Sequence, residues 1–172
     1  MLEIRQLTAA EGRQHLSELA DVLLDCVAAG ASVSFMSSLT KPDAEAFFLS
    51  VFEKVEAGGC VLLAAFLNSQ LVGTVQIVTA MPPNQPHRAD VAKLLVHRSA
   101  RRQGVGRQLM NQVEDIARQA GKTLLVLDTE TGGHAEKLYT ALGWNRMGVI
   151  PRYSLYPDGR WCDTTYFWKE LS

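Results

Sequence analysis

The fold is decided by the stretch Val91-Ala92-Lys93-Leu94-Leu95-Val96-His97-Arg98-Ser99-Ala100-Arg101-Arg102-Gln103-Gly104-Val105-Gly106-Arg107-Gln108-Leu109-Met110. An apolar run suited to a buried strand leads into a short basic turn, and the apolar spacing after that turn predicts a long helix over residues 104–120. Gly104 and Gly106 have no side chain, so a ligand can approach the backbone closely. The first amides of a helix lack partners within it and, together with the helix dipole, attract anions. The stretch therefore predicts a pyrophosphate site at a strand–turn–helix junction.

Three arginines, Arg101, Arg102 and Arg107, add positive charge around this turn. The spacing of the glycines excludes two other phosphate-binding motifs. A dinucleotide-binding turn requires a third glycine where Leu109 stands, and the Walker sequence G-x-x-x-x-G-K-[ST] is absent. On spacing alone, a tight turn with solvated arginines remains an equal alternative to a phosphate site.

Hydrophobic periodicity on both sides of this stretch predicts an α/β chain. The expected strands are a short one at Ile4–Leu7 and further ones over residues 60–66, 71–79, 89–96, 123–129, 144–150 and 161–169. The expected helices, besides 104–120, cover residues 8–29, 41–57 and 134–142. The strands before and after helix 104–120 should be parallel with a right-handed crossover, whereas the hairpins are antiparallel. We expect one domain over residues 1–172, built as a mixed, mostly antiparallel sheet with helices on both faces.

Composition restricts the function classes. A chain of 172 residues that is 47% apolar and 20% charged fits one globular domain. Its formal net charge of -1 gives no bias toward nucleic acid or a membrane surface, so neither partner is expected. Cys26, Cys60 and Cys162 form no C-x-x-C pair, and no metal site is expected. No signal peptide is visible at the N-terminus, so a reducing cytoplasm is the expected compartment.

Two segments resemble motifs of the GNAT acetyltransferases. Arg101-Arg102-Gln103-Gly104-Val105-Gly106 is similar to the R/Q-x-x-G-x-G/A pyrophosphate loop of that family, and Leu94-Leu95-Val96 to the preceding strand, whose backbone pairs with pantetheine. The segment from Ala135 to Trp144 resembles the A-x-x-x-Y-x-x-x-G-F segment. The resemblance implies a GNAT-like fold and acetyl-CoA as the acetyl donor. The cofactor contacts that it implies are Leu94, Leu95, Val96, Arg101, Arg102, Gln103, Gly104, Val105, Gly106, Arg107, Ala135 and Tyr139.

Further matches resemble the tabtoxin-resistance branch of this family. They comprise Gly30-Ala31-Ser32-Val33, Lys93-Leu94, Leu127-Asp128-Thr129-Glu130 and Pro157-Asp158-Gly159-Arg160. That branch acetylates an amino group of a small amino-acid-like toxin, so the resemblance implies a primary amine on a small molecule as acceptor, a role in antibiotic resistance, and a homodimer. Acetylation of protein N-termini or lysines, and a non-catalytic acyl-CoA sensor, remain alternatives.

Acetyl transfer to an amine requires removal of a proton from the amine, stabilisation of the thioester oxygen and protonation of the leaving thiolate. Backbone amides of residues 94–96 are expected to bind the oxygen, because a splayed strand leaves an N–H unpaired. Tyr139 is the expected acid for the thiolate, since a phenol of pKa about 10 suits a thiol of similar basicity. Its alternative role is that of a core aromatic, because apolar residues surround it at helical spacing.

Asp128 and Asp90 are the candidates for the base. Asp128 follows the apolar run Leu124–Leu127, so it can also bind a substrate ammonium, or it can be a plain turn residue. Asp90 precedes the cofactor strand and is expected to share a face with Leu94 and Val96. Glu130 is a third candidate that can lie beyond the site. Weaker candidates are His87, His97 and His134, and the loops 30–36 and 81–86 are expected to wall the acceptor pocket. Direct transfer is expected, without an acetyl-enzyme.

Overall fold

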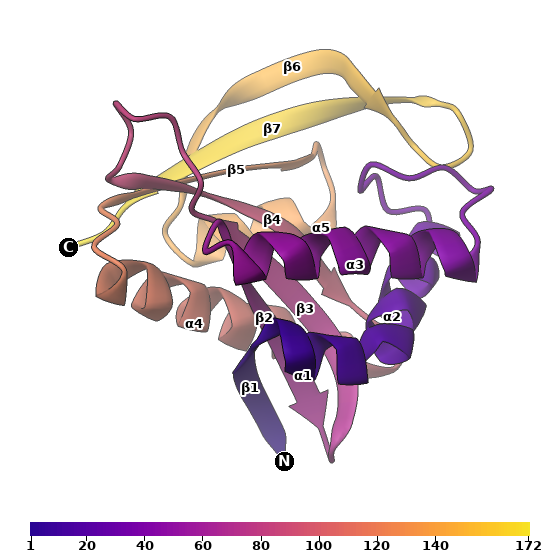
Figure 1. The fold of residues 1–172 in the computed structure, drawn as a ribbon. Helices are drawn as coiled ribbons and strands as arrows, with labels where there is room; N and C mark the ends of the chain where they lie inside the picture. The colour runs from indigo at the N-terminus through magenta and orange to yellow at the C-terminus, as the bar shows by residue number, and fades with distance from the viewer.

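The computed structural model describes residues 1–172 as one seven-stranded sheet with helices on both faces (Figure 1). In chain order the elements are β1 (Leu2–Leu7), α1 (Ala9–Gln14), α2 (Leu16–Ala28), α3 (Lys41–Glu56), β2 (Cys60–Leu67), β3 (Gln70–Val78), β4 (Arg88–Val96), a 3-10 turn (Arg98–Ala100), α4 (Val105–Gln119), β5 (Leu124–Glu130), α5 (His134–Ala141), β6 (Asn145–Leu155) and β7 (Trp161–Glu170). The strand order is β1-β2-β3-β4-β5-β7-β6. Only the β4–β5 pair is parallel, so the expected mixed, mostly antiparallel sheet is confirmed.

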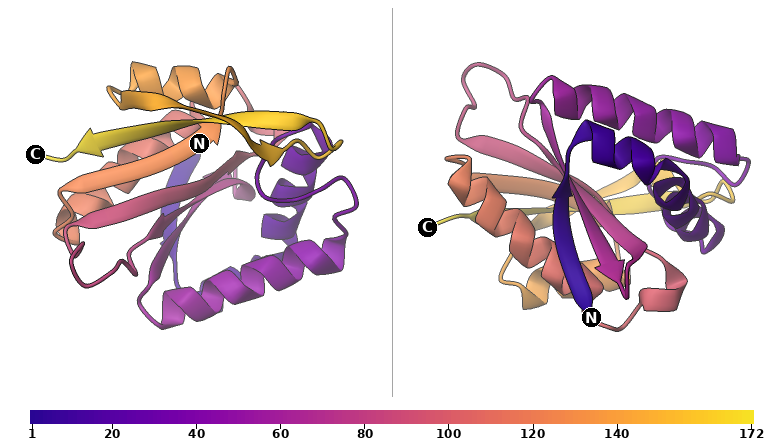
Figure 2. Two further views of the ribbon diagram at one scale, coloured as in Figure 1. Left: turned by 90° about the horizontal axis from the view of Figure 1, so that it is seen from above. Right: turned by 60° about the horizontal axis from the view of Figure 1, so that its bottom comes forward.

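Helices lie on both faces of the sheet (Figure 2), and an apolar core fills the space between the sheet and the helices on each face. Successive side chains of a strand point to opposite faces, and β2 shows this alternation clearly. Leu62 packs with the core of α2 and α3, whereas Leu63 packs with the core of α4 and α5. The two cores define the two faces that are called the α2–α3 face and the α4–α5 face below.

The first helical region differs from the expectation of one helix over residues 8–29, because it is broken at His15. The Thr8 capping box is present, with the Glu11 amide donating to Thr8 Oγ1 at 3.2 Å and the Thr8 amide donating to Glu11 Oε2 at 2.8 Å. At Gly12 a Cβ would lie 2.4 Å from the Phe52 ring, so α1 packs directly on α3. This close packing and the contact of the His15 ring with Phe66, at 5.1 Å between centroids, give α1 and α2 different directions.

The strand β6 runs past its expected end at Ile150, through Pro151, to Leu155. The strand lies at the edge of the sheet and pairs only with β7, so a proline that lacks an N–H costs no ladder bond on its open side. The register shifts between Ile150 and Ser154, where Arg152 has a φ of 52°. The remaining strand and helix boundaries lie close to those expected.

The three cysteines, Cys26, Cys60 and Cys162, are free and buried. None of the helices combines the length and the apolar character needed to cross a membrane.

Candidate active site

The parallel strands β4 and β5 separate shortly after they begin. Arg88, Ala89 and Asp90 pair with Leu124, Leu125 and Val126, and the ladder stops there. The rest of β4, residues 91–96, keeps its pairing with β3 but has no strand on its other edge. A free strand edge presents backbone N–H and C=O groups in a row. The splayed strand expected from the sequence is therefore present, and it leads toward the first turn of α4.

A β-bulge interrupts β4 beside this opening. Thr74 of β3 pairs with Leu95, but Gln76 pairs with Ala92, so β4 holds an extra residue between them. Lys93, which lies in the bulge, has a φ of 55°. A bulge of this kind changes which face the following side chains occupy.

The bulge overturns one expectation about Asp90. Downstream of it, Leu94 and Val96 pack against the α4–α5 core. Asp90 instead lies on the α2–α3 face. It stands two residues before Ala92, so the two side chains share a face, and Ala92 pairs with Gln76 of that face. The expectation that Asp90 shares a face with Leu94 and Val96 is therefore wrong, since simple alternation does not hold across an inserted residue.

The glycine turn has the geometry of an anion site. Gly104, the N-cap of α4, has a φ of 79°, a conformation that glycine adopts without a steric penalty. The first hydrogen bond inside α4 runs from the Gln108 amide to the Gly104 carbonyl at 3.0 Å, so the amides of residues 105–107 have no partner within the helix. A Cβ at Gly106 would approach Leu138 Cδ2 of α5 at 3.3 Å. The missing side chain therefore lets α5 lie close to these free amides.

Asp25 of α2 holds this turn in place, which the sequence reasoning missed. Its carboxylate accepts a hydrogen bond of 2.8 Å from the Arg98 amide and forms an ion pair with the Arg98 guanidinium. Nη2 of Arg101 and Nε2 of His97 each lie 3.7 Å from its oxygens. Burial alone would raise the pKa of Asp25, but the hydrogen bonds from Arg98 and the charges of His97 and Arg98 outweigh it and lower the pKa. An acid on the otherwise apolar face of α2 is the sequence signal for this contact.

The residues expected at the phosphates divide into two groups. Arg101 also donates to the Val96 carbonyl at 3.2 Å and Gln103 to the Ser99 carbonyl at 3.0 Å, so both side chains hold the turn. Arg102 and Arg107 are exposed and form no ion pair in the protein. They are therefore the arginines whose charge is available to a ligand.

Tyr139 lies in the core, but its hydroxyl is left without a partner. Its ring is 5% exposed and packs against Trp144 and Phe167, with centroids 6.0 and 5.7 Å away. Its hydroxyl makes no hydrogen bond within the protein. The oxygen is also not fully enclosed, so a ligand can reach it. Burial and the negative charge of Asp128 raise the pKa of Tyr139 well above its ordinary value. A core aromatic thus carries a spare, protonated hydroxyl.

The candidate bases lie together on the α2–α3 face. The pairing of Asp90 with Val126 and the alternation along β5 place Asp90, Asp128 and Glu130 on that one face. Asp90 is paired with Arg88, whereas Asp128 forms no ion pair. Burial raises the pKa of Glu130, against the hydrogen bond of Tyr156.

The base candidates and the acid candidate approach the opening from opposite faces. Tyr139 belongs to the α4–α5 core with Leu125 and Leu127. Asp128 follows Leu127 directly in β5, so its side chain points to the opposite, α2–α3 face. The charge of Asp128 nevertheless contributes to the raised pKa of Tyr139. They can act on one substrate pair only through the opening between β4 and β5.

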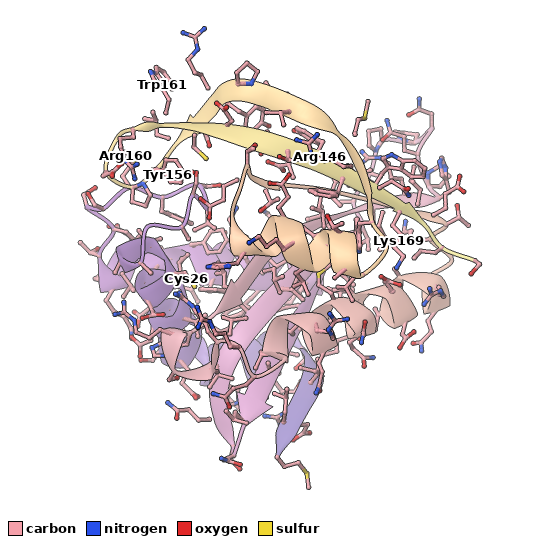
Figure 3. All side chains as sticks on the ribbon, turned by 180° about the vertical axis from the view of Figure 1, so that it is seen from behind. Cys26, Arg146, Tyr156, Arg160, Trp161 and Lys169 are labelled. Atoms are coloured by element: carbon pink, nitrogen blue, oxygen red, sulfur yellow. The ribbon has the colours of Figure 1, made fainter.

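The loop after α2 closes one side of the carboxylate-bearing face. The Ser37 amide donates to the Pro157 carbonyl at 3.0 Å, and Ser32 Oγ donates to the Leu155 carbonyl at 2.9 Å, so the loop is tied to the β6–β7 hairpin. A hollow of about 450 Å³ lies between this loop, the end of α2 and the hairpin turn. Figure 3 shows Tyr156 and Arg160 at that turn, and both line the hollow. The lining of the hollow includes none of Tyr139, Asp128 and Glu130.

The remaining expected residues are those of the loop 81–86 and the three histidines. The loop 81–86 lies at the beginning of β4, where Gln85 Oε1 accepts from Arg88 Nε at 2.8 Å, beside Asp90. Of the histidines, His97 contacts Asp25, and His134 begins α5. The His87 carbonyl accepts from the Thr123 amide at 2.8 Å.

Comparison with known proteins identifies the class. Residues 29–144 match the model of the acetyltransferase (GNAT) family, and the chain belongs to that family. The expected enzyme class, an acetyl-CoA-dependent N-acetyltransferase, is thereby confirmed.

Solved structures share the fold at low sequence identity. One is a Salmonella typhimurium protein assigned as an acetyltransferase and solved with its cofactor acetyl-CoA, at 20% identity and a TM-score of 0.80, covering 99% of this chain and 94% of that one. A ribosomal-protein-alanine N-acetyltransferase from Brucella melitensis is 24% identical, with a TM-score of 0.79 and coverage of 98% and 99%. A protein assigned as a phosphinothricin N-acetyltransferase is 19% identical, with a TM-score of 0.80 and coverage of 100% and 99%.

Proposed function

We propose that this enzyme transfers the acetyl group of acetyl-CoA directly to a primary amine of a small molecule. The observation that carries the proposal is the separation of β4 from β5 after Asp90, which opens a free strand edge leading to the unpartnered amides of α4. An extended amide-bearing chain that ends in a pyrophosphate fits this combination, because the strand edge pairs with amides and the helix start binds phosphate.

The donor is assigned to the residues that line this path. The backbone of Leu94, Leu95 and Val96 pairs with pantetheine, and one of its amides stabilises the thioester oxygen. The pyrophosphate lies on the amides of Val105, Gly106 and Arg107, next to Gly104, with the charges of Arg102 and Arg107 nearby. Arg101 and Gln103 hold the turn that presents these groups, and Ala135 and Tyr139 approach the donor from α5.

The α2–α3 face supplies the base of the reaction, and the α4–α5 face supplies the acid. Asp128 takes a proton from the acceptor ammonium, with Asp90 as the second candidate, and the freed amine attacks the thioester carbon. When the tetrahedral intermediate collapses, the carbon–sulfur bond breaks and Tyr139 gives its proton to the thiolate. The nitrogen loses its second proton to water, and Tyr139 is reprotonated from water. The raised pKa keeps Tyr139 protonated in the resting enzyme, but it also makes this phenol a weaker acid than the match with the thiol assumed. The buried Cys26 and Cys60, whose thiol pKa values are raised by burial, are poor candidates for an acetyl-enzyme.

A small acceptor is supported by the two hydrogen bonds that tie the loop after α2 to the β6–β7 hairpin, because a fixed loop favours a closed pocket over an open groove. The similarity to a protein assigned as a phosphinothricin N-acetyltransferase agrees with this acceptor class and with a role in resistance to an amino compound. The similarity to a ribosomal-protein-alanine N-acetyltransferase keeps a protein N-terminus as the alternative.

The proposal includes a homodimer formed through β6. This edge strand has an open backbone side and carries exposed apolar residues, among them Met147 at 79% and Ile150 at 44% exposure. An exposed apolar edge strand pairs readily with a second chain.

The proposed function is tested by incubating the protein with acetyl-CoA, a library of small amines and a set of peptides, with mass spectrometry of the products and measurement of released CoA. We expect acetylated small amines in amounts equal to the CoA released. Acetylated peptides alone would assign the enzyme to protein substrates. Tight acetyl-CoA binding without CoA release from any mixture would support a sensor.

A further inference from the structure

The segment 97–104 joins the free edge of β4 to the start of α4. It lies at the surface, since Ala100 is its only buried residue, and the side chains of Arg98 and Arg101 are 59% and 44% exposed. Two of its residues, Arg102 and Gly104, have φ values of 61° and 79°. Apolar packing therefore fixes little of this segment, and its conformation depends on polar contacts.

Asp25 supplies such contacts from α2. Its side chain is 8% exposed, and its carboxylate accepts a hydrogen bond of 2.8 Å from the Arg98 amide and pairs with the Arg98 guanidinium. Nη2 of Arg101 and Nε2 of His97 each lie 3.7 Å from its oxygens. One buried carboxylate thus meets three basic side chains of the segment. Because a buried carboxylate without partners is unfavourable, these contacts hold the segment against α2.

The same contacts extend to the end of β4. Arg101 Nε donates to the Val96 carbonyl at 3.2 Å. Cys26, which follows Asp25 in α2 and is labelled in Figure 3, donates from Sγ to the same carbonyl at 3.5 Å. Val96 is the last residue of the free edge. Helix α2 therefore holds the end of this edge through Arg101 and Cys26, and the turn that follows it through Arg98.

Acetyl-CoA has to meet both ends of the segment at once. In the proposed function, its pantetheine pairs with residues 94–96 and its pyrophosphate lies on the free amides of residues 105–107. When one ligand binds two parts of a site, the second contact benefits from the first only if the parts are correctly separated. A segment that keeps this separation before the ligand arrives lowers the ordering cost of binding.

We propose that Asp25 is a positioning residue of the donor site, which fixes the pantetheine-pairing edge of β4 relative to the pyrophosphate-binding amides of α4. The inference rests on the proposed function, because these two halves of the site are assigned there. Asp25 itself touches no part of the donor. It acts through Arg98, which begins the turn, and through Arg101, which holds the Val96 carbonyl.

The test compares the whole donor with its two halves. The probes are acetyl-CoA, S-acetylpantetheine and ADP, with Kd measured by calorimetry, by competition where binding is weak. Asp25→Asn keeps the size of the side chain and removes the charge that holds Arg98 and Arg101. We expect the Kd of acetyl-CoA to rise about tenfold or more, while the Kd values of the two halves change less than about twofold, because only the whole donor depends on the separation.

Other roles of Asp25 give different results. If its negative charge merely repels the phosphates, Asp25→Asn will tighten the binding of both acetyl-CoA and ADP. If it shapes only the start of α4, both will bind more weakly by the same factor. If it serves the fold alone, the melting temperature will fall and all three Kd values will stay the same. Each of these results overturns the inference.

Glu114→Gln is the matched control for the loss of a buried ion pair. Glu114 is 11% exposed and pairs with Lys169 at 2.7 Å and Arg118 at 3.3 Å, in the later turns of α4. This variant should also lower the melting temperature, but it should leave the Kd of acetyl-CoA unchanged. A rise in Kd equal to that of Asp25→Asn would show that any buried pair has this effect and would overturn the inference.

Arg101→Met is the second variant, which decides the question if Asp25→Asn does not fold. It leaves the bond between Asp25 and the Arg98 amide in place and removes the link to the Val96 carbonyl. We expect the same selective loss of acetyl-CoA affinity. An equal loss of ADP affinity would instead make Arg101 a phosphate ligand and would overturn the inference.

Gly106→Val separates a failure of the inference from a failure of the donor site. If this variant binds acetyl-CoA and ADP as the wild type does, the donor lies elsewhere, and both the assigned site and the inference fail. If it weakens both ligands while Asp25→Asn changes neither, the inference alone fails.

Discussion

Thr164 Oγ1 lies 3.0 Å from Asp128 Oδ2 and also 3.0 Å from the Thr129 carbonyl, and it is the only group of the protein that bonds to this carboxylate. The bond orients Asp128 and leaves Oδ1 free for an amine. We expect Asp128→Asn to lower kcat by about a hundredfold or more, because an amide can neither accept the proton nor hold the ammonium by charge. Steady-state kinetics with an identified acceptor gives kcat, and calorimetry should show an unchanged Kd for acetyl-CoA.

Asp90→Asn is the matched comparison. Asp90 is already paired with Arg88, so its loss should cost less than that of Asp128. Full activity of both variants across the pH range would assign proton removal to water or to another group such as Glu130.

A second prediction concerns the donor site. A valine at Gly106 brings its Cβ to 3.3 Å from Leu138 Cδ2 and places two methyl groups beside the free amides of α4. We expect Gly106→Val to raise the Kd of acetyl-CoA more than tenfold in calorimetry. Leu138 is only half-buried, so it can shift, and the melting temperature should fall little.

Gly148→Val is the control, because a Cβ there meets no atom within 4 Å and the residue lies on β6. Both variants should fold. An unchanged affinity in a folded Gly106→Val protein would remove the basis of the pyrophosphate assignment.

The sequence predicted those features that depend on local rules. The glycine turn and the helix that follows it could be placed because glycine conformation and free helix amides involve residues a few positions apart. The bulge at Lys93 could not be predicted, since it is visible only in the pairing with β3.

Features that join distant elements were missed for the same reason. Asp25 and Arg98 are 73 positions apart, and only the packing of α2 against β4 brings them together. The face occupied by Asp90 depends on the register with Gln76. Residue types indicated the chemistry of the site, but the face on which each group acts follows from strand pairing.

A third prediction follows from Asp25. Its pKa is lowered in the folded protein, so its ionised form stabilises the fold above the unfolded pKa of about 3.9, and this contribution is lost as the pH falls toward the folded pKa. We expect Asp25→Asn to lower the free energy of unfolding by about 2 kcal/mol at pH 7, and the difference from wild type to shrink below about pH 4. Urea unfolding at several pH values measures it. A difference that stays constant down to pH 2 would show that the charge of Asp25 is unimportant.

A fourth prediction concerns the exposed edge strand. Met147→Lys and Ile150→Lys together replace two exposed apolar side chains of β6 with charged ones. This double variant should convert a dimer to a monomer of 18.9 kDa in light scattering. Leu49→Lys, at a residue of α3 that is 42% exposed, is the control and should leave the mass unchanged. A wild-type protein that is monomeric at all accessible concentrations would contradict the assignment.

The last prediction concerns Tyr139, whose ring and hydroxyl can be separated by one substitution. Tyr139→Phe keeps the ring and its packing against Trp144 and Phe167, and it removes only the oxygen. Because the hydroxyl bonds to no protein group, a purely structural tyrosine predicts an unchanged or higher melting temperature and an unchanged rate.

The acid role predicts a different combination. The melting temperature and the Kd of acetyl-CoA should stay the same, while kcat falls by about ten- to a thousandfold. The loss should be smaller with acetyl donors whose thiol is more acidic than CoA, because such a thiolate leaves without a proton. Wild-type turnover in the Phe variant, under conditions where chemistry limits the rate, would refute the acid assignment. A loss of activity that parallels a loss of melting temperature would instead assign Tyr139 to the core.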